Sequence, residues 1–177
     1  MIFNKTTLAD AFVLDIQKRG DERGFFGRTY CEAEFAAHGL ATHYPQMNTN
    51  YSAKRGTLKG LHLQAAPNEE AKFIRCLSGA AYELICDLRP ASATYRKWEA
   101  FEITAANRRM LYAPPGFGHA FFSLEDDTEI TYLCSASYAP GGEWGVRWND
   151  PGFDFKWPFE PSVVSEKDAA WPDYANR

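Results

Sequence analysis

Residues 82–88 read Tyr-Glu-Leu-Ile-Cys-Asp-Leu and carry the clearest strand signal in the chain. Successive side chains of a strand point to opposite faces, so this run predicts a strand buried on at least one side. Other short runs of similar character are bounded by turn residues such as Ser78-Gly79 and Arg89-Pro90. We expect strands at residues 12–16, 25–30, 57–63, 71–77, 80–88, 98–103, 108–113, 119–124 and 129–134. Such a series predicts an all-β sandwich or barrel.

Helical patterning is limited to short segments. Residues 31–38, CEAEFAAH, have helical periodicity and stop at Gly39. The tail from Trp148 onward is interrupted by prolines and rich in aromatic residues, so we expect it to pack over the barrel. Ser165 is placed to cap a short helix that starts at Glu166. We find no internal boundary and predict a single domain over residues 1–177, with its few short helices mainly near the C-terminus.

The composition narrows the class of protein. The chain has 177 residues, of which 45% are hydrophobic and 24% charged, so wholesale disorder is excluded. A net charge of −4 argues against a nucleic-acid partner, which requires a basic face. The absence of a long apolar run predicts no membrane span, and the polar N-terminus predicts a cytoplasmic protein. The four scattered cysteines favour buried reduced thiols over a disulfide or a zinc site.

Two of the four histidines are candidates for chemistry. His62 lies in GTLKGLHLQ, residues 56–64, and Lys72 follows on the next expected strand. A hairpin would bring the two side chains together, and a neutral imidazole beside an ammonium group is a credible base and anion stabiliser. His119 ends the run Pro-Pro-Gly-Phe-Gly-His, which resembles the second motif of cupins. Metal-binding cupins carry His-x-His where this chain has His62-Leu63-Gln64, so we expect no metal. His38 and His43 are expected on the surface.

Several short stretches of the sequence, taken in their order along the chain, resemble one family, the dTDP-4-dehydrorhamnose 3,5-epimerases of nucleotide-sugar biosynthesis. The resemblance covers nearly the whole chain and implies a cupin-type jelly-roll barrel. The matching fragments are DERGFF at residues 21–26, GLHLQ at 60–64, Lys72, DLRP at 87–90, PGF at 115–117, His119, Tyr132, Tyr138, WNDP at 148–151, Trp157-Pro158 and SEKD at 165–168.

The resemblance implies a cofactor-independent reaction on a dTDP-4-keto-6-deoxyhexose. The C4 ketone acidifies the hydrogens on C3 and C5, so a base and an acid on opposite faces invert these carbons through an enolate. His62 matches the family's base, and Asp168 matches the carboxylate that orients it. Lys72 matches a cation near the enolate oxygen. Tyr132 matches the acid, although a structural barrel tyrosine is the alternative reading of that residue.

The resemblance further implies a set of substrate-binding positions and a homodimer that exchanges N-terminal strands. These positions are Arg23, Gln46, Asn48, Lys59, His119, Glu143 and Lys167. A solvated surface role is the alternative for Glu143 and Lys167. Two residues depart from the family pattern: Lys59 replaces the usual arginine, and Arg28 stands where many members carry an acidic residue.

Four other functions stay open at this stage. The chain is alternatively a 3-epimerase or 3,4-ketoisomerase of the same kind of sugar, a metal-dependent dioxygenase, or a sugar-nucleotide-binding cupin without turnover.

Overall fold

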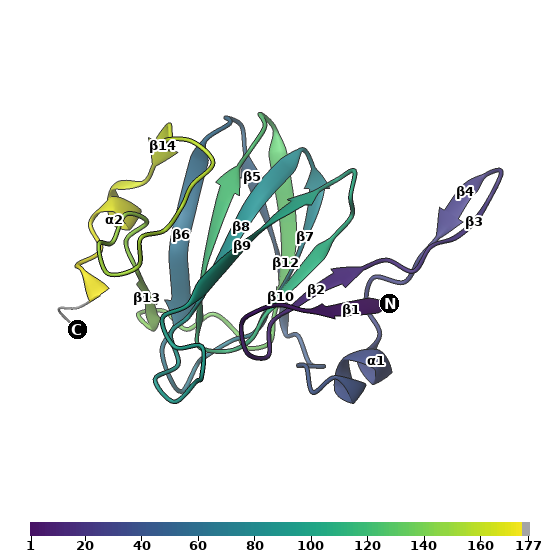
Figure 1. Cartoon of the computed structure of the whole chain (residues 1–177), viewed down its shortest axis with the longest axis horizontal. Helices are drawn as coiled ribbons and strands as arrows, with labels where there is room; N and C mark the ends of the chain where they lie inside the picture. The colour runs from purple at the N-terminus through teal and green to yellow at the C-terminus, as the bar shows by residue number, and fades with distance from the viewer. Residues whose placement is uncertain (175–177) are drawn as a thin grey trace.

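Two antiparallel sheets face each other and form a barrel of the jelly-roll type in the computed structural model, which describes residues 1–174 (Figure 1). The strand order of the first sheet is β1 (Ile2–Lys5), β2 (Phe12–Asp15), β10 (Met110–Ala113), β7 (Lys72–Ser78), β12 (Thr128–Cys134) and β5 (Gln46–Ser52). The order of the second is β13 (Glu143–Gly145), β6 (Thr57–Gln64), β11 (Phe117–Ser123), β8 (Ala80–Asp87) and β9 (Trp98–Thr104), with β14 (Val163–Val164) parallel to β6. The predicted all-β fold is confirmed.

The core between the sheets follows from the alternation seen in the sequence. On β8, Ala81 and Ile85 point into the cluster shared by both sheets, where they join residues such as Ile74 of β7. Leu84 and Cys86 point to the opposite face and belong to a second cluster. Both faces of β8 are therefore buried, which is why its run is apolar at almost every position.

The C-terminal segment forms the cover of the second cluster, as the tail composition predicts. Phe153 and Phe155 are buried there, and Trp157 packs against them. Figure 1 shows this segment beside β6, and it contains β14 and α2 (Glu166–Ala169). The segment thus places a helix at one side of the barrel.

Two short helices occur among the described residues. The helix predicted at residues 31–38 is α1 (Glu32–Ala37), one residue shorter at each end. The second helix is α2, and the Ser165 hydroxyl oxygen accepts a hydrogen bond from the backbone N–H of Asp168 at 3.1 Å. The predicted cap is therefore confirmed, and one of the two helices lies near the C-terminus.

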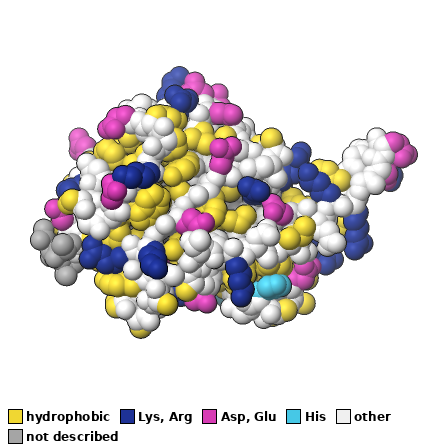
Figure 2. Space-filling model, in the orientation of Figure 1, with side chains coloured by type: hydrophobic (Ala, Val, Ile, Leu, Met, Phe, Trp, Pro, Cys, Tyr) yellow, Lys and Arg dark blue, Asp and Glu magenta, His cyan; other side chains and the backbone are white. Residues whose placement is uncertain are grey.

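The strand prediction was wrong at some edges. The strand expected at residues 25–30 is only the end of a hairpin, β3 (Arg19–Asp21) and β4 (Gly24–Phe26), which projects from the barrel (Figures 1 and 2). Five strands were not predicted from the sequence: β1, β3, β5, β13 and β14. The sequence of β5, QMNTNYS, lacks alternating apolar residues because this strand lies at the edge of its sheet.

The four cysteines are free thiols, of which Cys76, Cys86 and Cys134 are buried and Cys31 is half-buried. His38 and His43 are exposed, as expected. No helix in residues 1–174 combines the length and apolar character needed to cross a membrane.

Candidate active site

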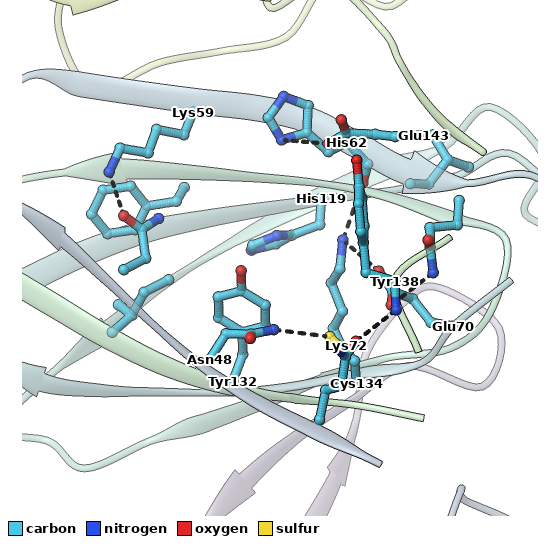
Figure 3. A pocket seen from close by; sticks show the side chains of 16 residues that line it. Asn48, Lys59, His62, Glu70, Lys72, His119, Tyr132, Cys134, Tyr138 and Glu143 are labelled. Atoms are coloured by element: carbon cyan, nitrogen blue, oxygen red, sulfur yellow. Dashed lines mark hydrogen bonds and ion pairs between the residues drawn. The ribbon is translucent and has the colours of Figure 1, made fainter. Parts of the chain in front are cut away.

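A cavity of about 240 Å³ opens between the two sheets. It is lined by residues of β5, β6, β7, β11, β12 and β13, so it draws side chains from both halves of the barrel. Eight of the residues predicted from the sequence line this cavity (Figure 3): Gln46, Asn48, Lys59, His62, Lys72, His119, Tyr132 and Glu143.

His62 and Asp168 form a hydrogen-bonded pair at the wall of the cavity. Nε2 of His62 lies 2.5 Å from Oδ1 of Asp168, although the two residues are 106 positions apart in the chain. Oδ2 of Asp168 also accepts the backbone N–H of Gly60 at 3.3 Å. Burial opposes ionisation of Asp168, but the hydrogen bond and charge of His62 and the bonds from Gly60 and Ser165 hold its pKa below the ordinary value. Asp168 is therefore a buried carboxylate at neutral pH.

A glycine at position 60 permits this arrangement. Gly60 has φ of +131°, and a Cβ atom there would lie 2.6 Å from the Cα of Ala120 on β11. The close approach of β6 and β11 therefore requires a residue without a side chain. It also brings the N–H of Gly60 to Asp168.

Lys72 reaches the cavity from the opposite sheet. The hairpin predicted between the His62 and Lys72 strands was wrong, because β6 and β7 belong to different sheets. Nζ of Lys72 lies 3.5 Å from the backbone oxygen of His62 and 3.3 Å from Oε1 of Glu70. The two side chains therefore meet across the barrel interior and not along one sheet.

Tyr132 lies in the middle of β12, and its hydroxyl points toward the ring of His119 (Figure 3). Burial raises the pKa of its phenol, and nearby carboxylates add to the shift. The phenol therefore holds its proton across the neutral range. This geometry places a potential proton donor inside the cavity.

Lys59 contributes a cation at the β5 side of the cavity. Its Nζ donates to Oδ1 of Asn50 and to the backbone oxygen of Tyr51 at 3.0 Å. Burial lowers the pKa of Lys59, and the charge of Asp168 opposes this shift only in part. The bonds to β5 hold the ammonium group against one wall.

Polar side chains complete the rim. Oε1 of Gln46 accepts the backbone N–H of Tyr138 at 2.6 Å, and Nδ2 of Asn48 lies 3.8 Å from Sγ of Cys134. Lys167 donates to Glu143, and this bond raises the pKa of Lys167.

Three predicted site residues are not in the cavity lining: Asp168 and Lys167 are bonded to the lining residues His62 and Glu143, whereas Arg23 lies away from the cavity. Arg23 occupies the tip of the projecting hairpin, where its side chain is 83% exposed and paired with Asp21 at 2.5 Å. Within one chain, Arg23 and the cavity are therefore separate.

Five residues line the cavity that were not predicted as site residues from the sequence: Asn50, Gln64, Glu70, Cys134 and Tyr138. Gln64 is two positions after His62, so strand alternation places both on one face and was a usable signal. Glu70 precedes β7 in a polar loop, and nothing local marks it as interior. Among residues 1–174, no group of three or more histidine, cysteine or acidic side chains is arranged to hold a metal ion.

A sequence model described as dTDP-4-dehydrorhamnose 3,5-epimerase matches residues 5–176 of the chain. A similar enzyme of that name from Sinorhizobium fredii is 35% identical over 97% of this chain and 89% of its own length. The chain belongs to this family. It is therefore an isomerase that epimerises a dTDP-linked keto-deoxyhexose.

Solved structures of this family superpose closely on the chain. The dTDP-4-dehydrorhamnose 3,5-epimerase of Elizabethkingia anophelis has a TM-score of 0.96 and 33% identity, over 100% of this chain and 98% of that one. ChmJ, a 3'-monoepimerase from Streptomyces bikiniensis in complex with dTDP-quinovose, has a TM-score of 0.87 and 32% identity, over 97% and 87%. The jelly-roll barrel of the chain is thus the epimerase fold.

Proposed function

We propose that His62 is the base that removes a proton from C3 or C5 of a dTDP-4-keto-6-deoxyhexose. The electron pair of the broken C–H bond moves into the C4 carbonyl and forms an enolate. Tyr132 then gives its phenolic proton to the same carbon from the opposite face, and the C–H bond reforms with inverted configuration. His62 afterwards loses its proton and Tyr132 regains one, so no net proton is consumed.

The observation that carries this proposal is the pair formed by Asp168 and His62. Asp168 is ionised and can only accept a hydrogen bond, so Nε2 of His62 carries the proton between them. The lone pair of a neutral His62 is then on Nδ1. Nδ1 is therefore the atom that takes the proton from the sugar.

Lys72 stabilises the enolate in this proposal. Its ammonium group is anchored by Glu70 and by the backbone of His62, so it is fixed in the cavity before the substrate arrives. A cation held in advance where charge develops lowers the barrier of the step. The ketone itself delocalises the negative charge, so the proposed reaction requires no metal or cofactor.

The nucleotide diphosphate occupies the mouth of the cavity in this proposal. The cavity of about 240 Å³ suits a sugar ring, and the larger dTDP group extends toward Lys59, Lys167 and the polar rim. Ammonium and guanidinium groups supply the charge-assisted hydrogen bonds that a diphosphate needs. Gln46, Asn48 and Glu143 border the same opening.

In this proposal, a homodimer brings Arg23 of the partner subunit to the cavity, because Arg23 does not reach the cavity of its own chain. The hairpin of β3 and β4 extends from the barrel, and its aromatic residues Phe25 and Phe26 are 42% and 68% exposed (Figure 1). An exposed apolar arm that projects from a subunit suits exchange between two copies related by a twofold axis. Arg23 of the partner subunit then reaches the diphosphate. The cytoplasm is the proposed compartment, since free buried thiols suit a reducing environment.

Deuterium exchange tests the reaction directly. The purified protein is incubated with dTDP-4-dehydro-6-deoxyglucose in deuterium oxide, and C3 and C5 are followed by NMR. We expect isotope uptake with inversion at both carbons, and none with His62→Asn. Folded wild-type protein that exchanges neither carbon would contradict the proposal.

A second candidate is epimerisation at C3 alone. It is favoured by the similarity to the 3'-monoepimerase ChmJ, whose barrel superposes over 97% of this chain. In the same assay, uptake at C3 without uptake at C5 identifies this activity.

A further inference from the structure

Glu83 is a buried carboxylate that the proposed mechanism does not use. It lies in the middle of β8, it is 0% exposed, and it shares its face with Ala81 and Ile85 of the apolar cluster between the sheets. Its cross-strand neighbour on β11 is Phe121, which belongs to the same cluster. A carboxylate in such surroundings is costly unless a neighbouring group compensates its charge.

His119 is the group that meets this carboxylate. Oε2 of Glu83 is hydrogen-bonded to Nε2 of His119, whereas Oε1 has no hydrogen-bond partner within residues 1–174. Cys76 of β7 and Tyr132 of β12 also feel the charge of Glu83, but burial raises the pKa of both, so they stay neutral and add no positive charge. Compensation of the carboxylate therefore falls to the imidazole.

The number of protons shared by Glu83 and His119 determines whether Nδ1 of His119, the ring nitrogen that does not contact Glu83, carries a proton. The pair has no net charge if an imidazolium donates Nε2–H to a carboxylate, or if a carboxylic acid donates to Nε2 of a neutral ring. Both arrangements leave a proton on Nδ1. In the remaining arrangement, a neutral imidazole donates Nε2–H to an ionised Glu83, and Nδ1 carries no proton. This arrangement leaves a net negative charge in the apolar interior, which is unfavourable because the charge is removed from water.

We propose that Glu83 is a positioning residue that keeps a proton on Nδ1 of His119, so that His119 donates a hydrogen bond to the ligand in the cavity. His119 lines the cavity with Lys72 and Tyr132 (Figure 3). This inference rests on the proposed function for the identity of the ligand. Its natural acceptor is a sugar oxygen, and the C4 oxygen gains most from a fixed donor because it becomes negative in the enolate.

The protonation state of His119 is measurable without any substrate. The chain has four histidines, so ¹⁵N-histidine labelling gives a simple NMR spectrum, and His119→Asn assigns its signals. At about pH 8 an ordinary imidazole, with a pKa of about 6.5, carries one proton and exchanges between tautomers. We expect wild-type His119 to hold a proton on Nδ1 at this pH. A bare Nδ1 overturns the inference, whichever sugar the enzyme uses.

Kinetics of Glu83→Leu test the consequence for the reaction. Leucine fits the apolar cluster and removes a carboxylate oxygen without a partner, so we expect the unfolding midpoint and the affinity for dTDP to be retained while kcat falls about 100-fold. Ile85→Leu is the matched control, because Ile85 faces the same cluster and is the cross-strand partner of His119. We expect this control to keep near-wild-type kcat.

A kcat of Glu83→Leu within about twofold of wild type overturns the inference, since removal of a donor aimed at developing charge costs far more. Where Glu83→Leu does not fold, Glu83→Asp replaces it, because the shorter side chain withdraws the carboxylate from Nε2 and is expected to give the same loss. Failure of the proposed function is a separate result: the wild-type protein then turns over no keto sugar, while the NMR experiment still reports on His119.

Discussion

Lys59 and His62 are three positions apart on β6, and both side chains line the same cavity. Strict strand alternation would place them on opposite faces. The register between β6 and β11 shifts between the pairs His119–His62 and Phe121–Lys59, so the strand is irregular at Gly60. This β-bulge changes the direction of one side chain, so the ammonium group of Lys59 and the imidazole of His62 face the same cavity.

Asp168→Asn is expected to lower kcat at least 100-fold while the barrel stays folded. An amide at this position no longer fixes the proton on Nε2 of His62, so part of the population has its lone pair on the wrong nitrogen, as in the Asp-to-Asn variant of the serine-protease triad. Steady-state kinetics at about pH 7 measure the loss. An unchanged kcat would remove Asp168 from the mechanism.

The lowered pKa of Asp168 also predicts how the free energy of unfolding depends on pH. Its pKa in the folded protein lies below the ordinary value of 3.8, so its stabilising contribution is complete above that value and is lost as pH falls through the folded-state pKa. The difference in unfolding free energy between wild type and Asp168→Asn should therefore shrink below about pH 4. Urea titrations at about pH 7 and about pH 3 measure it. Asp21→Asn, which breaks an exposed pair, serves as the control with little effect.

Tyr132→Phe separates proton removal from proton return. His62 still forms the enolate, but the opposite face lacks its acid, so we expect deuterium uptake with retained configuration and little epimer. Because burial raises the pKa of Tyr132, the wild-type acid should stay protonated up to and beyond about pH 10. NMR of the recovered sugar measures both outcomes, and normal inversion by Tyr132→Phe would show that another group is the acid.

Lys59→Arg tests the departure from the family pattern. Burial lowers the pKa of Lys59 below its ordinary value of 10.5, so its charge is lost at a lower pH than that of an exposed lysine, and KM for the sugar nucleotide should rise on the alkaline side. Arginine stays charged and adds a two-pronged donor, so the variant should show a KM independent of pH and about equal to or below that of wild type. Parallel alkaline KM profiles for both proteins would contradict this role.

Mixed dimers test whether Arg23, on the hairpin of β3 and β4, acts in the cavity of the partner subunit. Arg23→Ala should raise KM about tenfold with little change in stability, because its side chain is 83% exposed and its ion pair within residues 1–174 is with Asp21. His62→Asn should be inactive. When the two variants are refolded together, a hybrid dimer contains one cavity with both His62 and Arg23 of the partner subunit, so we expect activity at low substrate to recover. No recovery in a confirmed hybrid would show that Arg23 does not act in the cavity of the partner subunit.

Glu70→Gln tests the anchor of Lys72. Glu70 lies 3.3 Å from Nζ of Lys72 and also accepts from Nε2 of Gln64, so the amide variant keeps the shape and removes the charge that holds the ammonium group. We expect kcat to fall about tenfold with KM nearly unchanged, because the cation acts on the enolate and not on the nucleotide. The exposed Glu102→Gln is the control. A change confined to KM would assign Glu70 to substrate binding.

Local sequence information was sufficient for most of the barrel strands, for both short helices and for the chemistry of single residues. The alternation in residues 80–88, the helix at residues 31–38 and the cap at Ser165 all have counterparts in the structure, since each depends on neighbours in the chain. The order of family-like fragments also indicated His62, Lys72 and Tyr132, which the fold brings into one cavity. The edge strand β5 was missed because pairing, and not its own pattern, makes it a strand.

The tertiary structure alone decided which groups touch. The contact of His62 with Asp168 spans 106 positions, the approach of Lys72 crosses between sheets, and the pair of Glu83 with His119 joins two strands through the barrel interior. These distances depend on sheet register, on the bulge at Gly60 and on the burial that makes an uncompensated charge costly. None of these is a property of a short stretch of residues, because each arises only when distant segments pack against one another.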